Sequence, residues 1–121
     1  MKCAEKLKKV DFHDSLVENF IYKTDESLIN IEIELCNWKQ KNYRPDDSEM
    51  LTGIVTFIGV SEYYHEPAHL IFNSDEILTI EFIYDADESR EKIKMVLRGD
   101  DDVKLITFYA KDVELGFPLI V

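Results

Sequence analysis

The chain has 121 residues, of which 25 are acidic and 14 basic, and its formal net charge is -11. A chain of this length buries roughly two-thirds of the surface that its unfolded form exposes, so it forms one domain without needing a metal or a disulfide. Its negative field repels nucleic acids and anionic membranes and attracts basic partners, although an acidic surface also simply keeps a small protein in solution. Binding of DNA or RNA is therefore disfavoured.

Cysteine usage and the absence of long apolar runs indicate the compartment. Cys3, in a segment expected to be loose, and Cys36, inside an expected strand, make no disulfide framework, which fits reducing conditions. The lysine-rich stretch Met1–Val10 is not followed by an apolar run of signal-peptide length, and no stretch approaches the roughly 18 apolar residues of a membrane helix. We expect a cytoplasmic protein.

The N-terminal residues 1–12 form either a short helix with Leu7 and Val10 inward or a flexible segment, and their composition favours neither. The sequence His13-Asp14-Ser15 follows, and its Asp and Ser side chains can bond to nearby backbone N–H groups. A His-Asp pair can act as an oriented general base, but no nucleophile motif accompanies it. We interpret these residues as a turn that starts the first strand.

Residues Leu28–Trp38 carry the clearest pattern, because apolar and polar side chains alternate as in a strand with one buried face. The inward set is Ile29, Ile31, Ile33 and Leu35, and the outward set is Asn30, Glu32, Glu34 and Cys36. With Val17, Ile21 and Trp38 on the same side, this outer face is mixed rather than purely polar. It is expected to be covered by the chain ends or by a partner.

The stretch Leu16–Lys23 precedes this strand and forms a hairpin with it across Thr24–Ser27. The expected register pairs Tyr22 with Ile29, Phe20 with Ile31 and Leu16 with Leu35 on the inward face, leaving Val17, Asn19 and Ile21 outside. Glu18 would oppose Ile33 on the inward face. This conflict predicts either a bulge near Glu18 or an open sheet edge there.

Further strands follow the polar loop Lys39–Glu49. Met50–Val60 is apolar on both alternating sets, which predicts a central strand covered on both faces, with Gly53 and Gly59 at a bulge or close approach. The stretch Tyr63–Pro67 is expected to break it, Ala68–Asn73 reads equally as helix or strand, and Ile77–Tyr84 reads as a strand with Leu78, Ile80, Phe82 and Tyr84 on one side.

The last clear unit is a hairpin of Lys92–Arg98 and Val103–Ala110 around Gly99–Asp102, with positive φ expected at Gly99. A four-residue loop places Ile93, Met95, Leu97, Ile106 and Phe108 on the core face, while the mixed opposite face is a candidate contact surface. The apolar tail within Asp112–Val121 must be tucked in or engaged by another chain. The fold class is therefore mainly β: one antiparallel sheet or two-layer β-sandwich of about seven strands, with at most one or two short helices.

The segment His65-Glu66-Pro67-Ala68-His69 satisfies the HExxH pattern of zinc peptidases. The chemistry needs both histidines on one face of a helix, and Pro67 between them removes a backbone donor and crowds the preceding turn. A third ligand and an open coordination position are also needed. We interpret the segment as a loop over the sheet edge and predict no metal, no cofactor and no catalytic residue.

Two acidic segments are candidates for binding a cation or a basic partner. Asp85, Asp87 and Glu88 begin like a calcium loop, but the sixth position is Arg90 instead of glycine and the twelfth is Val96 instead of glutamate. Asp100, Asp101 and Asp102 read as a solvated turn or as a negative prong for a basic partner.

Four segments together resemble small bacterial β-rich proteins of uncharacterised function, some of which resemble immunity proteins of polymorphic toxin systems. These segments are Phe12-His13-Asp14-Ser15, the strand LINIEIELCNW, the strand Leu51–Val60 and the late strand Ile106–Ala110. The resemblance spans most of the chain but rests on short structural motifs. It implies a cytoplasmic protein that binds and neutralises a partner toxin, and it supplies no catalytic residues.

The sequence thus predicts a non-enzymatic module that binds a protein, with Tyr63, Tyr64, Asp100, Asp101 and Asp102 as the candidate contact residues. A net charge of -11 suits a basic toxin as the partner. Two alternatives stay open: a small metal-dependent hydrolase centred on His65, Glu66 and His69, and a homo-oligomer joined through the tail Phe117–Val121.

Overall fold

The computed structural model describes residues 2–41, 43–85 and 89–117. Within these residues the elements are α1 (Lys2–Leu7), β1 (Leu16–Lys23), β2 (Leu28–Cys36), β3 (Met50–Ile58), β4 (Ser61–Glu66), β5 (Asp75–Asp85), β6 (Arg90–Arg98), β7 (Val103–Ala110) and β8 (Asp112–Gly116). Short 3-10 turns at Thr24–Glu26 and Asn37–Lys39 follow β1 and β2. The mainly β class predicted from the sequence is confirmed.

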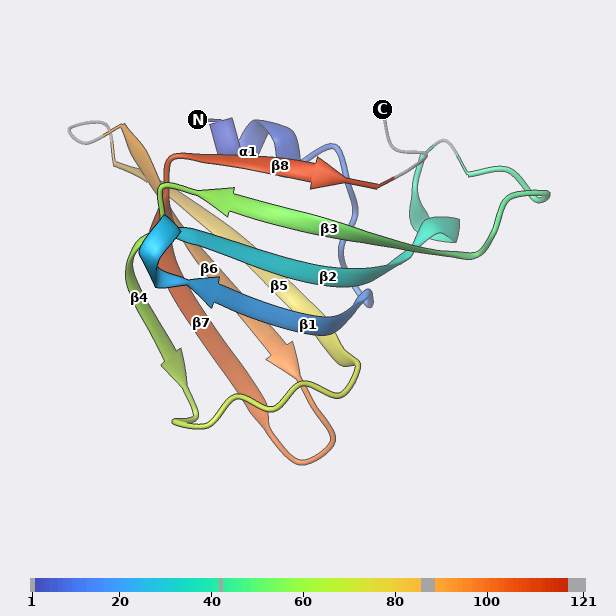
Figure 1. The fold of residues 1–121 in the computed structure, drawn as a ribbon. Coiled ribbons are helices and arrows are strands. Elements are labelled where there is room, and N and C mark those ends of the chain that lie inside the picture. Colours follow the sequence, from blue (N-terminus) through green and yellow to red (C-terminus); the bar gives the residue numbers. More distant parts are fainter. Residues whose placement is uncertain (1, 42, 86–88, 118–121) are drawn as a thin grey trace.

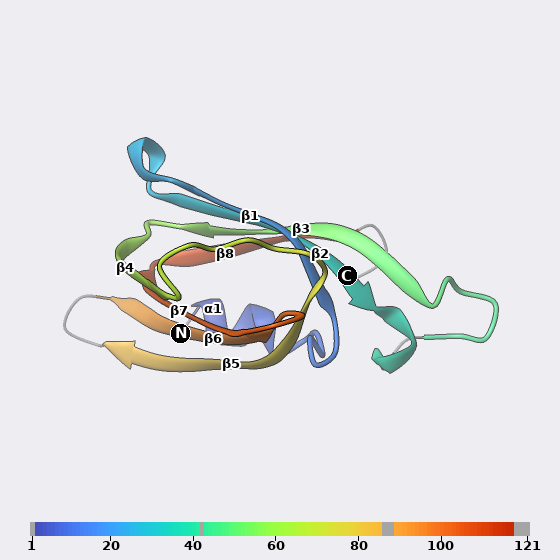
Figure 2. The same ribbon diagram turned by 90° about the horizontal axis from the view of Figure 1, so that it is seen from below.

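All these strands belong to one antiparallel sheet in the order β4-β7-β6-β5-β1-β2-β3-β8. Strands β1 and β5 join through only two residue pairs, Leu16 with Glu76 and Val17 with Asp75. The sheet folds over at this join, so that β4, β7, β6 and β5 form one layer and β1, β2, β3 and β8 form another (Figures 1 and 2). We call them the β6 layer and the β2 layer.

Both strands at the join carry a bulge, one between Val17 and Asn19 in β1 and one between Ile77 and Thr79 in β5. Bulges bend a strand and increase its twist, which explains why the sheet turns over here. The bulge at Leu78 shifts the alternation, so Ile77 is buried, while Ile80 and Phe82 pack against the core from the same strand. The register is continuous beyond the bulge, so Ile80, Phe82 and Tyr84 share one side as predicted, although Tyr84 at the far end of β5 is 43% exposed.

The β1–β2 hairpin follows the predicted register over most of its length. Tyr22 pairs with Ile29 and Phe20 with Ile31, as expected. The bulge at Glu18, one of the two predicted alternatives, then shifts the pairing, so that Leu16 lies opposite Glu34 instead of Leu35. Val17 is consequently fully buried, and its prediction as an outward residue was wrong because one inserted residue turns every following side chain to the other face.

The core lies between the two layers, and it contains the aliphatic side chains predicted for β2, β6 and β7. Phe57 of β3 and Phe108 of β7 meet across it with their ring centroids 4.9 Å apart and their planes at 72°. An edge-to-face pair of this kind adds to the stabilisation from burial alone. The Phe57–Phe108 contact therefore fastens one layer to the other.

Strand β3 is covered on one face only, contrary to the prediction. Val55 and Phe57 are buried, but Ile54 is 48% exposed on the outer face. The close approach predicted at Gly53 is confirmed, because a Cβ there would collide with the ring of Phe117. Gly59 has a φ of 68°, the turn conformation that glycine favours.

The segment Ser61–Glu66 is strand β4, although Tyr63–Pro67 was predicted to end the preceding strand and to form a loop over the sheet edge. It pairs with β7 and lies at the edge of the sheet. Ala68–Asn73, which the sequence left open between helix and strand, forms neither. The described residues form eight strands where about seven were predicted, because Ser61–Glu66 and Asp112–Gly116 are strands and Ala68–Asn73 is not.

The hairpin of β6 and β7 has the predicted four-residue loop, since Arg98 pairs with Val103. Gly99, however, is not among the residues with positive φ, so that part of the prediction was wrong. Glycine is needed at this position for space: a Cβ would lie 2.8 Å from Oδ2 of Asp75 and 2.9 Å from Nζ of Lys104.

The N-terminal segment forms the helix alternative of the prediction. The backbone N–H groups of Cys3 and Ala4 donate to the buried carboxylate of Glu91 in β6, at 2.7 and 3.0 Å. Lys6 reaches the other layer, where its Nζ lies 2.8 Å from Oδ1 of Asp112. Helix α1 therefore joins the layers, and Cys3 is fully buried rather than part of a loose segment.

Replacing Glu91 with alanine is expected to release α1 and expose the thiol of Cys3. The two lost hydrogen bonds to a charged acceptor correspond to about 1.5–3 kcal/mol each, enough to raise local opening by at least about tenfold. Burial and, second, the charge of Glu91 raise the pKa of the Cys3 thiol to about 12. The substitution removes the Glu91 charge and exposes the thiol, so both causes weaken and the reactivity of Cys3 should rise. Labelling by a thiol reagent should accelerate at Cys3 and not at Cys36, and equal acceleration at both would indicate global unfolding instead.

Candidate functional site

The sequence Phe12-His13-Asp14-Ser15 forms a turn at the place where the sheet folds over. The N–H of Asp14 donates to the carbonyl of Ile77 at 3.1 Å, and the N–H of Ile77 donates to the carbonyl of Ser15 at 2.8 Å. Asp14 has a φ of 67°, a conformation that Asp tolerates better than most residues. The turn predicted here is confirmed, and it ties β1 to β5 of the other layer.

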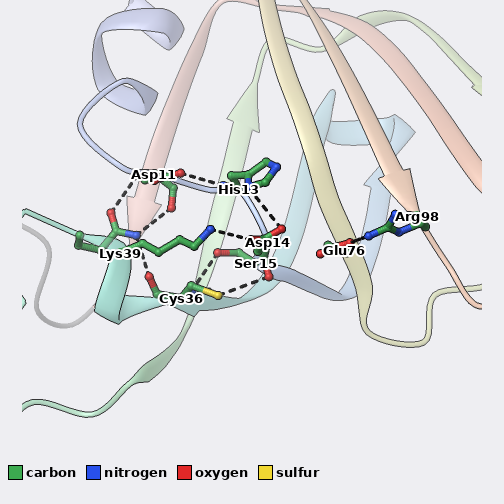
Figure 3. A network of polar contacts seen from close by, with 9 residues as sticks. Asp11, His13, Asp14, Ser15, Cys36, Lys39, Glu76 and Arg98 are labelled. Carbon is green, nitrogen blue, oxygen red and sulfur yellow. Dashed lines mark hydrogen bonds and ion pairs between the residues drawn. The ribbon is translucent and has the colours of Figure 1, made fainter.

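Ser15 and Cys36 are engaged inside this turn. The hydroxyl oxygen of the buried Ser15 accepts a hydrogen bond of 2.9 Å from the N–H of Cys36, and the Cys36 thiol donates to the carbonyl of Asp14 at 3.4 Å (Figure 3). Burial raises the pKa of the Cys36 thiol, which keeps it protonated near neutral pH. Both groups therefore hold the turn in place.

The polar side chains outside the turn are more accessible. The carboxylate of Asp14 lies 2.6 Å from Nζ of Lys39 and 3.3 Å from Nδ1 of His13, while Glu76 forms a separate ion pair with Arg98 (Figure 3). The Lys39 hydrogen bond lowers the pKa of Asp14, and the same bond raises the pKa of Lys39. The carboxylate beside His13 is thus shared with a lysine in a surface network.

The HExxH segment does not form the helix that the zinc-peptidase motif requires. His65 and Glu66 end strand β4, and the Glu66–Pro67 peptide bond is cis. Nδ1 of His65 lies 2.8 Å from the carbonyl oxygen of Pro67, and His69 follows in an irregular segment. Within residues 2–41, 43–85 and 89–117, no cluster of three or more His, Cys, Asp or Glu side chains could hold a metal ion. The calcium-like pattern includes Asp87 and Glu88, which lie outside the described residues.

The structure does not bring the predicted contact residues of β4 together on one surface. Tyr63 points inward, where its ring centroid lies 4.7 Å from that of Tyr22, and burial raises its pKa to about 12. Tyr64 points outward, is exposed, and donates to Glu66. Neighbouring residues of a strand face opposite sides, so only Tyr64 is available on the outer face.

The predicted acidic prong Asp100–Asp102 forms the β6–β7 loop, where two of its carboxylates have internal partners. Oδ1 of Asp102 accepts from Nζ of Lys104 at 2.9 Å, and Oδ2 of Asp100 accepts from Asn73 at 3.3 Å. Lys104 also contacts Oδ2 of Asp75 at 2.5 Å, and both of these side chains are almost completely buried. Asp102, whose side chain is 40% exposed, thus adds a second carboxylate to the buried Lys104–Asp75 pair, and a role of the loop in binding stays a prediction.

A hollow lies on the outer face of the β2 layer. It is an open groove of about 540 Å³, lined by Asn19, Ile21, Asn30, Glu32, Ile54, Thr56, Glu114, Leu115 and Gly116. Ile21 and Ile54 are 45% and 48% exposed within it. The sequence indicated the mixed character of this face through Ile21 and Glu32, but it did not indicate Ile54 or Glu114, which come from strands β3 and β8.

The apolar tail is tucked in as far as the described residues extend. Phe117 is buried, and its ring centroid lies 6.4 Å from that of Phe12. Residues 118–121 lie outside the described residues. Phe117, the first residue of the tail that was predicted to join two copies, therefore lies in the core.

In the part of the chain that the structure describes, no helix combines the length and the apolar character needed to cross a membrane. Comparison of the chain with family models, with curated proteins and with solved structures found no match.

Proposed function

We propose that this protein is a non-enzymatic binding module that recognises a basic protein, and that it acts in the manner of an immunity protein by neutralising a basic toxin. The observation that carries the proposal is an open, acid-lined groove with exposed isoleucines on a chain whose net charge is -11. Apolar side chains within a charged rim are typical of protein-binding surfaces. The field of the chain would also speed the encounter with a basic partner.

The residues considered for catalysis support this choice over an enzyme. Ser15 and Cys36 are held by backbone groups in a buried turn, and the carboxylate beside His13 is paired with Lys39. The two histidines of the HExxH segment come from a strand end and an irregular segment. Nucleophilic catalysis needs an accessible nucleophile next to a base, and these contacts do not provide one.

The proposal is tested with a partner captured from the native host, identified by mass spectrometry and then purified. The partner is expected to be basic, and its affinity should fall by at least about tenfold between low and high salt, because steering between opposite charges is screened over about 8 Å at physiological ionic strength. Isothermal titration at several salt concentrations measures this dependence. An acidic partner, or an affinity independent of salt, would contradict the proposal.

A further inference from the structure

We infer that the groove on the outer face of the β2 layer is the docking site, and that its occupant is a segment of the basic partner that presents an apolar side chain between lysine or arginine residues. The inference rests on the function proposed above and names the site at which it operates. Three properties of the groove support it: a preformed floor, two glutamates that form no ion pair among the described residues, and two exposed isoleucines.

The floor is built by the central strands of the layer. Glu32 of β2 pairs with Ile54 of β3, and Asn30 pairs with Thr56, whose hydroxyl donates to Oδ1 of Asn30 at 2.8 Å. On the flanks, Asn19 and Ile21 of β1 continue the same two rows on one side, and Gly116 and Glu114 of β8 continue them on the other. Because all four strands are hydrogen-bonded to neighbours, a ligand would meet a surface that is already formed, which lowers the entropic cost of binding.

The two glutamates of the groove are not neutralised by a direct ion pair in the part of the chain that the structure describes. Among the described residues, neither Glu32 nor Glu114 forms an ion pair, and no basic residue lines the groove. On the outer face of the β6 layer, by contrast, Glu81 lies 4.0 Å from Nζ of Lys94. The groove therefore offers negative charge that a basic ligand can complement, whereas Glu81 already has a lysine of the chain beside it.

The surroundings of its isoleucines distinguish the groove from other exposed hydrophobic positions. Ile54 lies beside Glu32 in one row of the hollow, and Ile21 lies beside Asn30 on the β1 flank of the adjoining row, which ends in Glu114. Ile83 is more exposed, at 65%, but it pairs with Lys92 on the β6 layer, where a basic ligand would be repelled. An apolar side chain with neighbouring positive charges thus fits the groove and not the surface around Ile83.

Two short synthetic peptides serve as probes, one alternating arginine with leucine and one alternating arginine with serine. Binding is followed by NMR chemical shifts of the labelled protein. The leucine peptide is expected to shift the amides of Ile21, Glu32, Ile54 and Thr56 and to bind at least about tenfold more tightly than the serine peptide, because only leucine removes a large apolar surface from water on binding.

Matched variants locate the site. Glu32→Lys combined with Glu114→Lys should weaken binding of the leucine peptide at least about tenfold, since like charges then face each other. The control Asp100→Lys combined with Asp101→Lys raises the net charge equally on another surface and should change the affinity much less. In the same way, Ile54→Ser should weaken binding and Ile83→Ser should not.

The possible outcomes distinguish a wrong binding site from a wrong function. Loss of binding in the Asp100 and Asp101 variant instead, or shifts confined to another surface, would overturn the groove as the site and leave a basic-partner module in place. Equal binding of the two peptides would overturn the apolar anchor. Binding of neither peptide would overturn both the site and the proposed preference for basic partners.

Discussion

Replacing Lys104 with methionine is expected to lower the free energy of unfolding by about 3–5 kcal/mol, because it leaves a buried charge without its partner. Nζ of Lys104 lies 2.5 Å from Oδ2 of Asp75, and the side chains are 3% and 1% exposed. The remaining described contact of the Asp75 carboxylate is the N–H of Asn73, at 2.9 Å from Oδ1. Denaturant unfolding monitored by the fluorescence of Trp38 measures the change.

The matched control is Arg98→Met, which breaks the solvent-exposed ion pair with Glu76 and should cost less than about 1 kcal/mol. Adding Asp75→Asn to Lys104→Met should restore part of the lost stability, since the uncompensated charge is then removed. A Lys104→Met variant as stable as the Arg98→Met control would show that the ion pair is not buried as described.

The stabilisation that Lys104 provides should also depend on pH. Although burial alone would lower the pKa of the Lys104 ammonium, its hydrogen bonds to Asp102 and Asp75 outweigh that effect and raise it above the ordinary value of 10.5. A pKa raised on folding stabilises the fold fully below the unfolded value, and the stabilisation is lost as pH rises through the folded value. The stability difference between the wild type and Lys104→Met should therefore be constant near neutral pH and shrink above about pH 10.5.

Replacing Phe57 with alanine is the second change with a large expected effect, a loss of about 3–5 kcal/mol in the free energy of unfolding. Its ring is buried against Phe108, so truncation removes apolar burial and leaves a cavity between the layers. The exposed Tyr84 provides the control, because Tyr84→Ala should change stability by less than about 0.5 kcal/mol.

A double-mutant cycle of Phe57→Leu and Phe108→Leu tests the contact itself. The two side chains come from different layers, and an edge-to-face aromatic pair is expected to contribute a coupling energy of about 0.5–1.5 kcal/mol. Additive effects of the two substitutions would mean that β3 and β7 do not face each other across the core.

The sequence predicted the fold best where pairing is local and alternation is strict. The register of Tyr22 with Ile29, and the four-residue loop between Arg98 and Val103, depend on neighbouring segments joined by short loops. Strand β4 was missed because its polar and aromatic side chains suggest a loop, although Tyr63 inward and Tyr64 outward do alternate as in an edge strand. The strand order was also not predictable, since the β5–β1 join rests on two residue pairs far apart in the chain.

The candidate site was predictable only in part, because it combines residues of one hairpin with residues from strands that are distant in the sequence. Glu32 and Ile21 were identified on a mixed outer face because they belong to one hairpin. Ile54 belongs to a strand that was predicted to be covered on both faces. Glu114 belongs to β8, whose neighbour β3 lies far earlier in the chain. A surface assembled from strands that are distant in sequence becomes visible only once the strand order is known.

The salt dependence of partner binding, compared between the wild type and the Glu32→Lys and Glu114→Lys double variant, tests the central claim most directly. If an acidic groove binds a basic partner, the wild-type affinity should fall steeply as salt rises, whereas the double variant should bind at least about tenfold more weakly at low salt and respond less to added salt. Equal affinities and equal salt dependence for the two proteins would contradict the account.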